Sequence, residues 1–201
     1  LAHDGEVSAQ VYGGTRTLFN PLTFAVVGVD RHQSGAAARL TLPFAIDGLE
    51  NRVSVGADAQ WLNDARKNWA NCNAVPTANA SCPSLPHEKG NLTLDQRELV
   101  SSLGPYVRDE LEHGRWRLTA GVRADQVRFE VRDHFLADGR DDSGNRTLHA
   151  VSPMFGLAAR LSSFHSLYAN VGSAFETPTT TELGNQADGT GELQHSERQQ
   201  P

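Results

Sequence analysis

Residues 52–62 read Arg52-Val-Ser-Val-Gly-Ala-Asp-Ala-Gln-Trp-Leu62, and apolar and polar side chains alternate along the stretch. In an extended chain one face holds Val53, Val55, Ala57, Ala59 and Trp61, and the other holds Arg52, Ser54, Gly56, Asp58 and Gln60. Such period-two alternation predicts a β-strand with one apolar and one polar face. The run is about ten residues long, which is enough for a tilted strand to cross a bilayer. Trp61 stands at one end of the apolar face, where an aromatic girdle would lie.

A second stretch, Arg115-Trp-Arg-Leu-Thr-Ala-Gly-Val-Arg-Ala-Asp125, alternates in the same way and carries Trp116 at one end of its apolar face. After Asp125 the phase changes, because the apolar residues now stand at odd positions: Val127, Phe129 and Val131. Two structures would explain the change. One is a β-bulge near Asp125 and Gln126, and the other is a strand that continues beyond the membrane.

Weaker alternation predicts further strands at Glu6–Thr17, Thr23–Ile46, Asn91–Leu111, Val151–Leu161 and Leu167–Phe175, which gives about seven strands in all. From residue 47 onward the connections alternate in length. Those at 47–51, 112–114 and 162–166 are short, whereas those at 69–90, at 135–150 and after residue 175 are long. We therefore expect an all-β fold, a segment of an antiparallel up-and-down transmembrane β-barrel. A soluble β-sandwich could show the same alternation by chance.

Composition limits the other classes of protein. The net charge is -6, with 18 basic and 24 acidic residues and no basic stripe, so no nucleic-acid partner is expected. No stretch approaches the roughly 20 apolar residues of a membrane helix, and that does not exclude barrel strands. Cys72 and Cys82 lie in a stretch rich in Asn, Pro, Ala and Ser, which favours a local disulfide in an oxidising compartment over two free thiols. Zinc is not expected, because no second pair of ligands stands at metal spacing.

One segment near the end carries a family resemblance. Leu167-Tyr-Ala-Asn-Val-Gly-Ser-Ala-Phe-Glu-Thr-Pro-Thr-Thr-Thr-Glu-Leu183 resembles the Tyr-Ala-x-x-Gly-x-x-Phe-x-x-Pro-x-x-x-Glu-Leu stretch of TonB-dependent outer-membrane receptors. The matching positions are Tyr168, Gly172, Phe175, Pro178, Glu182 and Leu183. Further segments resemble the same family in the same order: Gly14–Phe24 with Val29–Arg31, Trp116–Asp125 and Val151–Gly156. The resemblance covers the chain from about Glu6 to Asn185.

The resemblance implies a barrel of approximately 22 strands that is closed by a plug. Residues 1–185 would then be a partial barrel with about seven of those strands. Residues 186–201 do not follow the family's pattern, and we hypothesise a truncated or frame-shifted reading frame there. The resemblance also implies a bacterial outer membrane, its lipid, a ferric siderophore or similar ligand, and a TonB complex. Neither plug nor TonB-contacting segment is recognisable in this sequence, so the TonB contact would belong to the plug of a longer parent protein.

The sequence shows no catalytic constellation, so we expect neither an enzyme nor a cofactor or metal site. The histidines are scattered, and Asp138, Asp141 and Asp142 do not match a calcium loop. Asp58, Gln60, Arg123 and Asp125 are expected to face the lumen, where Arg123 and Asp125 would hold the plug by charged hydrogen bonds. The alternative is that they are only the polar half of barrel strands.

Arg66 and Trp69 are candidates for touching a siderophore, because cationic and aromatic groups suit an anionic ferric chelate. Pro178 is expected to end the pairing of the last strand, since proline cannot donate to a ladder. We therefore expect part of a receptor for TonB-driven import. A passive porin or an adhesin barrel without energy coupling is the alternative, and the signature at Phe175–Leu183 favours the first.

Overall fold

Seven antiparallel strands pair in sequence order into one open sheet. The computed structural model describes residues 5–23, 25–46, 48–73, 80–82 and 89–180. The strands are β1 (Glu6–Leu22), β2 (Ala25–Ile46), β3 (Leu49–Asn71), β4 (Lys89–His113), β5 (Trp116–Asp133), β6 (Gly144–Arg160) and β7 (Ser166–Gly172), and a short 3-10 helix spans Leu136–Asp138. The prediction of an all-β, up-and-down segment of about seven strands is confirmed.

The strands are longer than the alternation predicted. β3 and β4 contain 23 and 25 residues, whereas a tilted strand needs about 9–11 residues to cross a bilayer. β6 begins at Gly144, so the predicted connection at 135–150 is shorter than expected. In the part of the chain that the structure describes, no helix is long and apolar enough to span a membrane.

Short turns gather at one end of the sheet. Gly48 and Gly114 have φ angles of 81° and 58°, a left-handed conformation that glycine adopts without steric cost, and each closes a tight turn. The β6–β7 connection at 161–165 lies at the same end. The connection at 134–143 lies at the other end, where β3 ends and β4 begins. The β1–β2 connection at 23–24 is also short, although it lies at the long-loop end.

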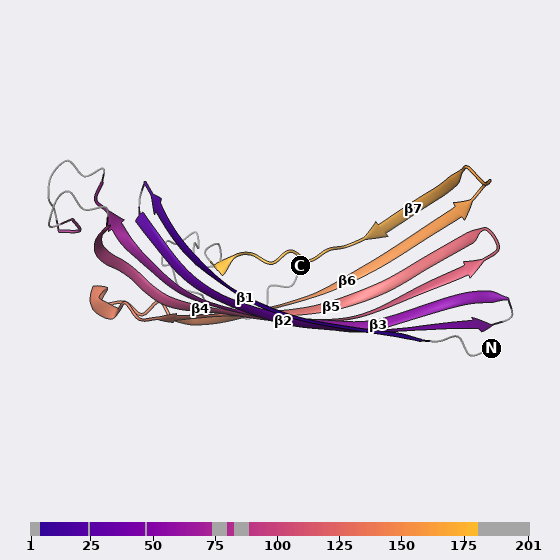
Figure 1. Cartoon of the computed structure of the whole chain (residues 1–201), viewed down its shortest axis with the longest axis horizontal. Coiled ribbons are helices and arrows are strands. Elements are labelled where there is room, and N and C mark those ends of the chain that lie inside the picture. The colour runs from indigo at the N-terminus through magenta and orange to yellow at the C-terminus, as the bar shows by residue number, and fades with distance from the viewer. Residues whose placement is uncertain (1–4, 24, 47, 74–79, 83–88, 181–201) are drawn as a thin grey trace.

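The sheet is curved, and the segment after β7 runs along its concave side (Figure 1). We call this concave side the inner face and the convex side the outer face. Asp58 and Arg123 line a hollow on the inner face together with Phe175, which follows β7. Because side chains alternate along a strand, Trp61 and Trp116 point to the outer face.

The change of phase on β5 is not a bulge. Arg123 pairs with Ser152, Asp125 with Ala150 and Val127 with Leu148, so the register runs through without a shift. Val127, Phe129 and Val131 are therefore on the inner face, where they are buried with exposed fractions of 6%, 3% and 6%. The strand continues beyond the apolar part of the outer face, as the second explanation predicted.

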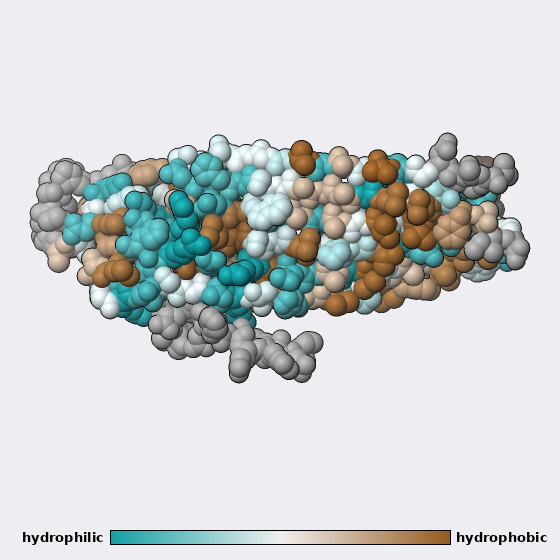
Figure 2. All heavy atoms as spheres, turned by 90° about the horizontal axis from the view of Figure 1, so that it is seen from below, coloured by the Kyte–Doolittle hydropathy of each residue, from teal (hydrophilic) through white to brown (hydrophobic). Residues whose placement is uncertain are grey.

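The outer face carries an apolar band near the short turns. We define the band by the outward side chains of residues 36–44, 53–61, 116–124 and 151–159. Figure 2 shows it as brown spheres toward the turn end, with hydrophilic side chains over much of the other half. Trp61 and Trp116 are 52% and 46% exposed and stand at opposite ends of the band. This arrangement matches a lipid-facing band bordered by aromatic girdles.

Candidate functional site

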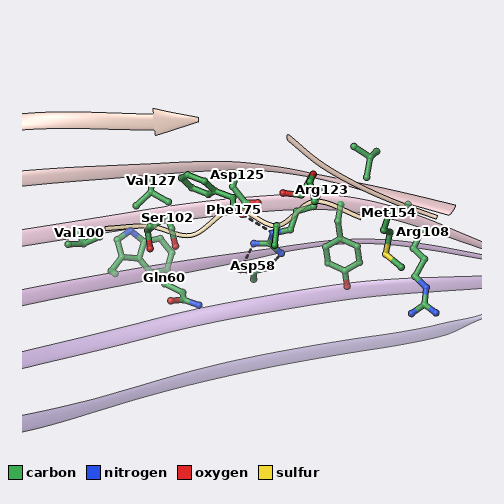
Figure 3. A pocket seen from close by; sticks show the side chains of 18 of the residues that line it. Asp58, Gln60, Val100, Ser102, Arg108, Arg123, Asp125, Val127, Met154 and Phe175 are labelled. Carbon is green, nitrogen blue, oxygen red and sulfur yellow. Dashed lines mark hydrogen bonds and ion pairs between the residues drawn. The ribbon is translucent and has the colours of Figure 1, made fainter. Parts of the chain in front are cut away.

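The inner face holds a hollow of about 820 Å³ between β3, β4, β5 and the segment after β7 (Figure 3). Asp58, Gln60, Arg123 and Asp125 all line it. The structure thus brings together the four residues that the sequence predicted to face the lumen.

Arg123 joins two strands that are not neighbours. Its Nη1 donates to Oδ2 of Asp58 at 2.6 Å and its Nη2 donates to Oδ1 of the same carboxylate at 3.1 Å. Its Nε donates to Oδ1 of Asp125 at 2.7 Å. Asp58 lies on β3 and Asp125 on β5, so the guanidinium reaches across β4. A bidentate contact between an arginine and a carboxylate fixes the orientation of both side chains and is stronger than a single hydrogen bond.

Gly104 on β4 makes room for this bridge. It pairs with Asp58 across the β3–β4 ladder. A Cβ atom added there would lie 1.8 Å from Nη2 of Arg123 and 2.8 Å from Oδ1 of Asp125. The bridge therefore requires a residue without a side chain, and reasoning from the sequence missed this position.

Two tyrosines lie over glycines on the same face. Tyr12 pairs with Gly35, and Tyr106 pairs with Gly56. A Cβ atom added at Gly35 would lie 2.4 Å from Cζ of Tyr12, and one at Gly56 would lie 2.7 Å from Cζ of Tyr106. Covering a strand glycine with an aromatic ring restores the packing that glycine lacks and helps to fix the register.

Nearer the long-loop end, two buried carboxylates are paired with arginines. Arg31 contacts Asp64 at 2.6 Å, and Arg66 contacts Glu98 at 3.4 Å. Asp64 and Glu98 are only 3% and 5% exposed. Gln96 donates a further hydrogen bond to Glu98 at 2.7 Å. Pairing offsets the cost of taking these charges out of water.

The family-signature residues occupy separate places. Tyr168 lies in β7 opposite Ala158, and Gly172 ends that strand. Phe175 packs against the cluster of Val127, Phe129 and Val131, together with Val100 and Leu148. Glu182 and Leu183 lie outside the described residues.

The expected role of Pro178 stays a prediction, although the ladder between β6 and β7 already ends before that residue. The last ladder residue is Gly172, and the amide of Ser173 still donates to the carbonyl of Pro153 at 3.0 Å. Pro178 therefore does not end the pairing with β6, and the other edge of β7 has no partner strand among the described residues.

Arg66 and Trp69 are not brought together. They are three positions apart on β3, and because side chains alternate they point to opposite faces. Trp69 lies over Gly28 on the outer side, and Nζ of Lys89 stands 3.3 Å from the centroid of its ring. Arg66 is on the inner face beside Glu98.

The β3–β4 connection contains a disulfide between Cys72 and Cys82, with Cα atoms 5.7 Å apart. Asn91, on β4, holds this connection by two hydrogen bonds. Its backbone N–H donates to the carbonyl oxygen of Ser81 at 2.9 Å, and its side-chain Nδ2 donates to the carbonyl oxygen of Ala80 at 2.7 Å. Within the described ranges, no group of three or more His, Cys, Asp or Glu residues is placed to hold a metal ion.

Comparison with known proteins gives one family match and several structural ones. The family described as "TonB dependent receptor-like, beta-barrel" matches residues 3–198. The ferric citrate transporter FecA in its unliganded form is similar with a TM-score of 0.64 at 16% identity, over 84% of this chain and 24% of that one.

The siderophore receptor PiuA from Acinetobacter baumannii is similar with a TM-score of 0.58 at 16% identity, over 83% of this chain and 29% of that one. BauA, the ferric preacinetobactin receptor from the same organism, is similar with a TM-score of 0.55 at 13% identity, over 83% of this chain and 26% of that one. At such identities these likenesses concern the fold. The chain spans about a quarter of the length of these proteins.

Proposed function

Because the chain belongs to the TonB-dependent receptor-like β-barrel family, we propose that it forms part of the wall of a bacterial outer-membrane receptor. The complete receptor would import a ferric siderophore or a similar nutrient and would draw energy from the TonB complex. The TonB contact would be made by a plug in the parent protein.

The observation that carries this proposal is the distribution of polarity across the sheet. The outer face has an apolar band with Trp61 and Trp116 at its ends, and the inner face at the same level carries Asp58, Arg123 and Asp125. An apolar outside and a polar inside are what a barrel needs to sit in lipid and enclose an aqueous or plugged lumen.

The Arg123 bridge would serve as a contact for the plug. The side chain of Arg123 is 36% exposed and that of Asp58 is 29% exposed, so both keep surface toward the lumen. Each carboxylate can accept more hydrogen bonds than the bridge uses. Backbone amides or hydroxyl groups of a plug could therefore bind here without breaking the bridge.

Arginines at the long-loop end would attract an anionic ferric chelate. By their register, Arg16, Arg31, Arg66 and Arg146 lie on the inner face there. Asp64, Glu98 and Asp133 lie on the same part of that face, and the segment that carries Glu176 crosses it, so the attraction for an anion depends on which arginines have an ion-pair partner. Arg16 directly opposes Arg31, and no carboxylate among the described residues pairs with Arg16 or Arg146. Trp69 is on the other face and is not part of this proposed site.

Uptake of a radiolabelled ferric chelate by cells that make the complete receptor tests the proposal. We expect uptake that stops when TonB is deleted and falls about tenfold or more in an Arg16→Ala/Arg146→Ala variant, since hydrogen bonds to charged groups contribute roughly 1.5–3 kcal/mol each. Lys67→Ala, which removes a cation from the outer face at the same end of the sheet, is the control. Undiminished uptake without TonB would favour the passive barrel instead.

A further inference from the structure

A second hollow, of about 720 Å³, lies on the outer face of the sheet just beyond the apolar band. Its outward lining includes Ser34, Trp61, Asn63, Leu99, Ser101 and Arg128. Trp61 is the last residue of the band on β3, so the hollow begins where the apolar surface ends. Trp61 and Leu99 give this hollow apolar contacts. Ser34, Asn63 and Ser101 give it hydrogen-bonding groups, and Arg128 gives it a cation.

Positive charge is in excess beside this hollow. Arg97 on β4 and Arg132 on β5 are register partners that both point outward. Like charges directly across a ladder destabilise a sheet unless a counter-charge lies nearby. Glu130 contacts Arg132 at 2.7 Å and Arg128 at 3.4 Å, which leaves one carboxylate shared between two arginines.

The other charged groups nearby do not remove this excess. Lys67 and Asp95 pair with each other at 3.0 Å. Among the residues that the structure describes, no carboxylate forms an ion pair with Arg97. Asp30, which lies two strands from Arg97 in the same register row of the outer face, is the other carboxylate nearby. Against Glu130 and Asp30, the patch of Arg97, Arg128 and Arg132 keeps a net positive charge.

We propose that this hollow and its arginine patch bind the phosphorylated head group of a glycolipid in the outer leaflet, an inference that rests on the proposed outer-membrane location. Guanidinium groups match phosphate oxygens, with the forked hydrogen bonds that Arg forms well. Ser34, Asn63 and Ser101 supply hydrogen-bond partners for sugar hydroxyls. The acyl chains of the same molecule would lie along the apolar band below Trp61.

The position of the patch favours a lipid over the imported ligand. The patch faces away from the inner face, so a chelate inside the barrel would not meet it. The patch also borders the apolar band at its long-loop end, which is the external end in barrels of this architecture. A head group and its chains can therefore be held by one continuous surface.

The test uses the complete receptor purified in detergent, with lipopolysaccharide as the probe and native mass spectrometry to measure binding. We expect removal of the lipid's phosphates to weaken binding by about tenfold or more, the effect of losing one charge-assisted hydrogen bond. The Arg97→Ala/Arg128→Ala/Arg132→Ala variant should lose affinity to a similar extent. Arg39→Ala, which removes a similarly exposed arginine from the inner face, should bind as the wild type does.

Equal binding of the intact and the dephosphorylated lipid would overturn the proposal, and this comparison needs no variant to fold. Equal binding by the triple variant would also overturn it. Heat-modifiable migration of each variant verifies that its barrel is folded. Binding in detergent does not depend on import, so a receptor that transports but fails this test loses only the lipid site.

Discussion

At the scale of single residues, position 104 on the inner face accepts only glycine, because Arg123 occupies the space that a side chain would need. Arg123 lies over Gly104 to reach Asp58 and Asp125, and an added methyl group would meet the guanidinium at 1.8 Å. We expect Gly104→Ala to displace Arg123 and to lower the free energy of unfolding by roughly 1 kcal/mol, because the partly exposed bridge is lost. Urea unfolding of the complete receptor, followed by tryptophan fluorescence, measures the change.

Gly14 provides the matched control. It is also a strand glycine on the inner face, and the nearest atom to an added Cβ is the side-chain nitrogen of Gln33 at 3.8 Å. Gly14→Ala should leave stability unchanged or raise it slightly, because alanine has less conformational freedom to lose on folding. A loss of the same size at both glycines would show that the bridge is not the cause.

The need for glycine at 104 could not be read from the sequence. The chain has 18 glycines, and this one is distinguished only by what lies across the ladder from it. The alternation did place Asp58, Arg123 and Asp125 on polar faces, because the face of a side chain depends only on local periodicity. Which of them meet depends on the register between strands, which local periodicity does not contain.

At the scale of elements, β5 shows what alternation can and cannot decide. The pattern predicted the strand and recorded the change of phase after Asp125, yet a bulge and a continuing strand give the same pattern. The unbroken β5–β6 register distinguishes them. Arg66 and Trp69 show the opposite case, since their spacing of three in a strand already placed them on different faces.

The boundary of the apolar band on β5 can be tested with two substitutions on one face of one strand. Ala120 lies inside the band, and Gln126 lies just beyond it. Ala120→Arg should destabilise the folded barrel by about 2–4 kcal/mol, whereas Gln126→Arg should cost less than about 1 kcal/mol. Urea titration of the complete receptor in lipid vesicles measures both. Equal costs would mean that lipid also covers Gln126.

The disulfide restrains one connection, and its loss should remain local. Joining Cys72 to Cys82 removes roughly 2–3 kcal/mol of loop entropy from the unfolded connection in the chain-entropy model. We expect Cys72→Ser/Cys82→Ser to be cleaved faster between β3 and β4 while the strands stay resistant. Limited proteolysis with mass spectrometry shows the cleavage sites. Reductant should have the same effect on the wild type and none on the variant, and protection of the variant would contradict this.

At the scale of the whole molecule, β1 and β7 are the open edges of the sheet. In hydrocarbon each unpaired edge amide or carbonyl costs several kcal/mol, so closed barrels rather than open sheets span membranes. We therefore expect the 201-residue chain alone neither to insert stably nor to transport. Heat-modifiable migration and ligand uptake, measured with the chain alone in vesicles, test this, and either activity would refute it.

The family, and the number of strands among the described residues, could be predicted, because the order of the motifs and the alternation of side chains are both visible in the sequence. The curvature and the course of the segment after β7 could not. Phe175 was recognised as a signature position, yet it packs against Val127, Phe129 and Val131 because the segment after β7 leaves the sheet and crosses the inner face, a course that no local pattern encodes.

The limits of the apolar band also set the membrane thickness that the segment tolerates. The run Trp116–Ala124 corresponds to roughly 20–25 Å of hydrocarbon once the tilt of a barrel strand is included. A bilayer with a core of about 30 Å would have to thin around the protein or cover Gln126 and Arg128 with lipid, a hydrophobic mismatch with an energetic cost for each ångström. The bacterial outer membrane is thinner than average, so the same residues that hold the wall in lipid also favour one membrane of the cell over the other.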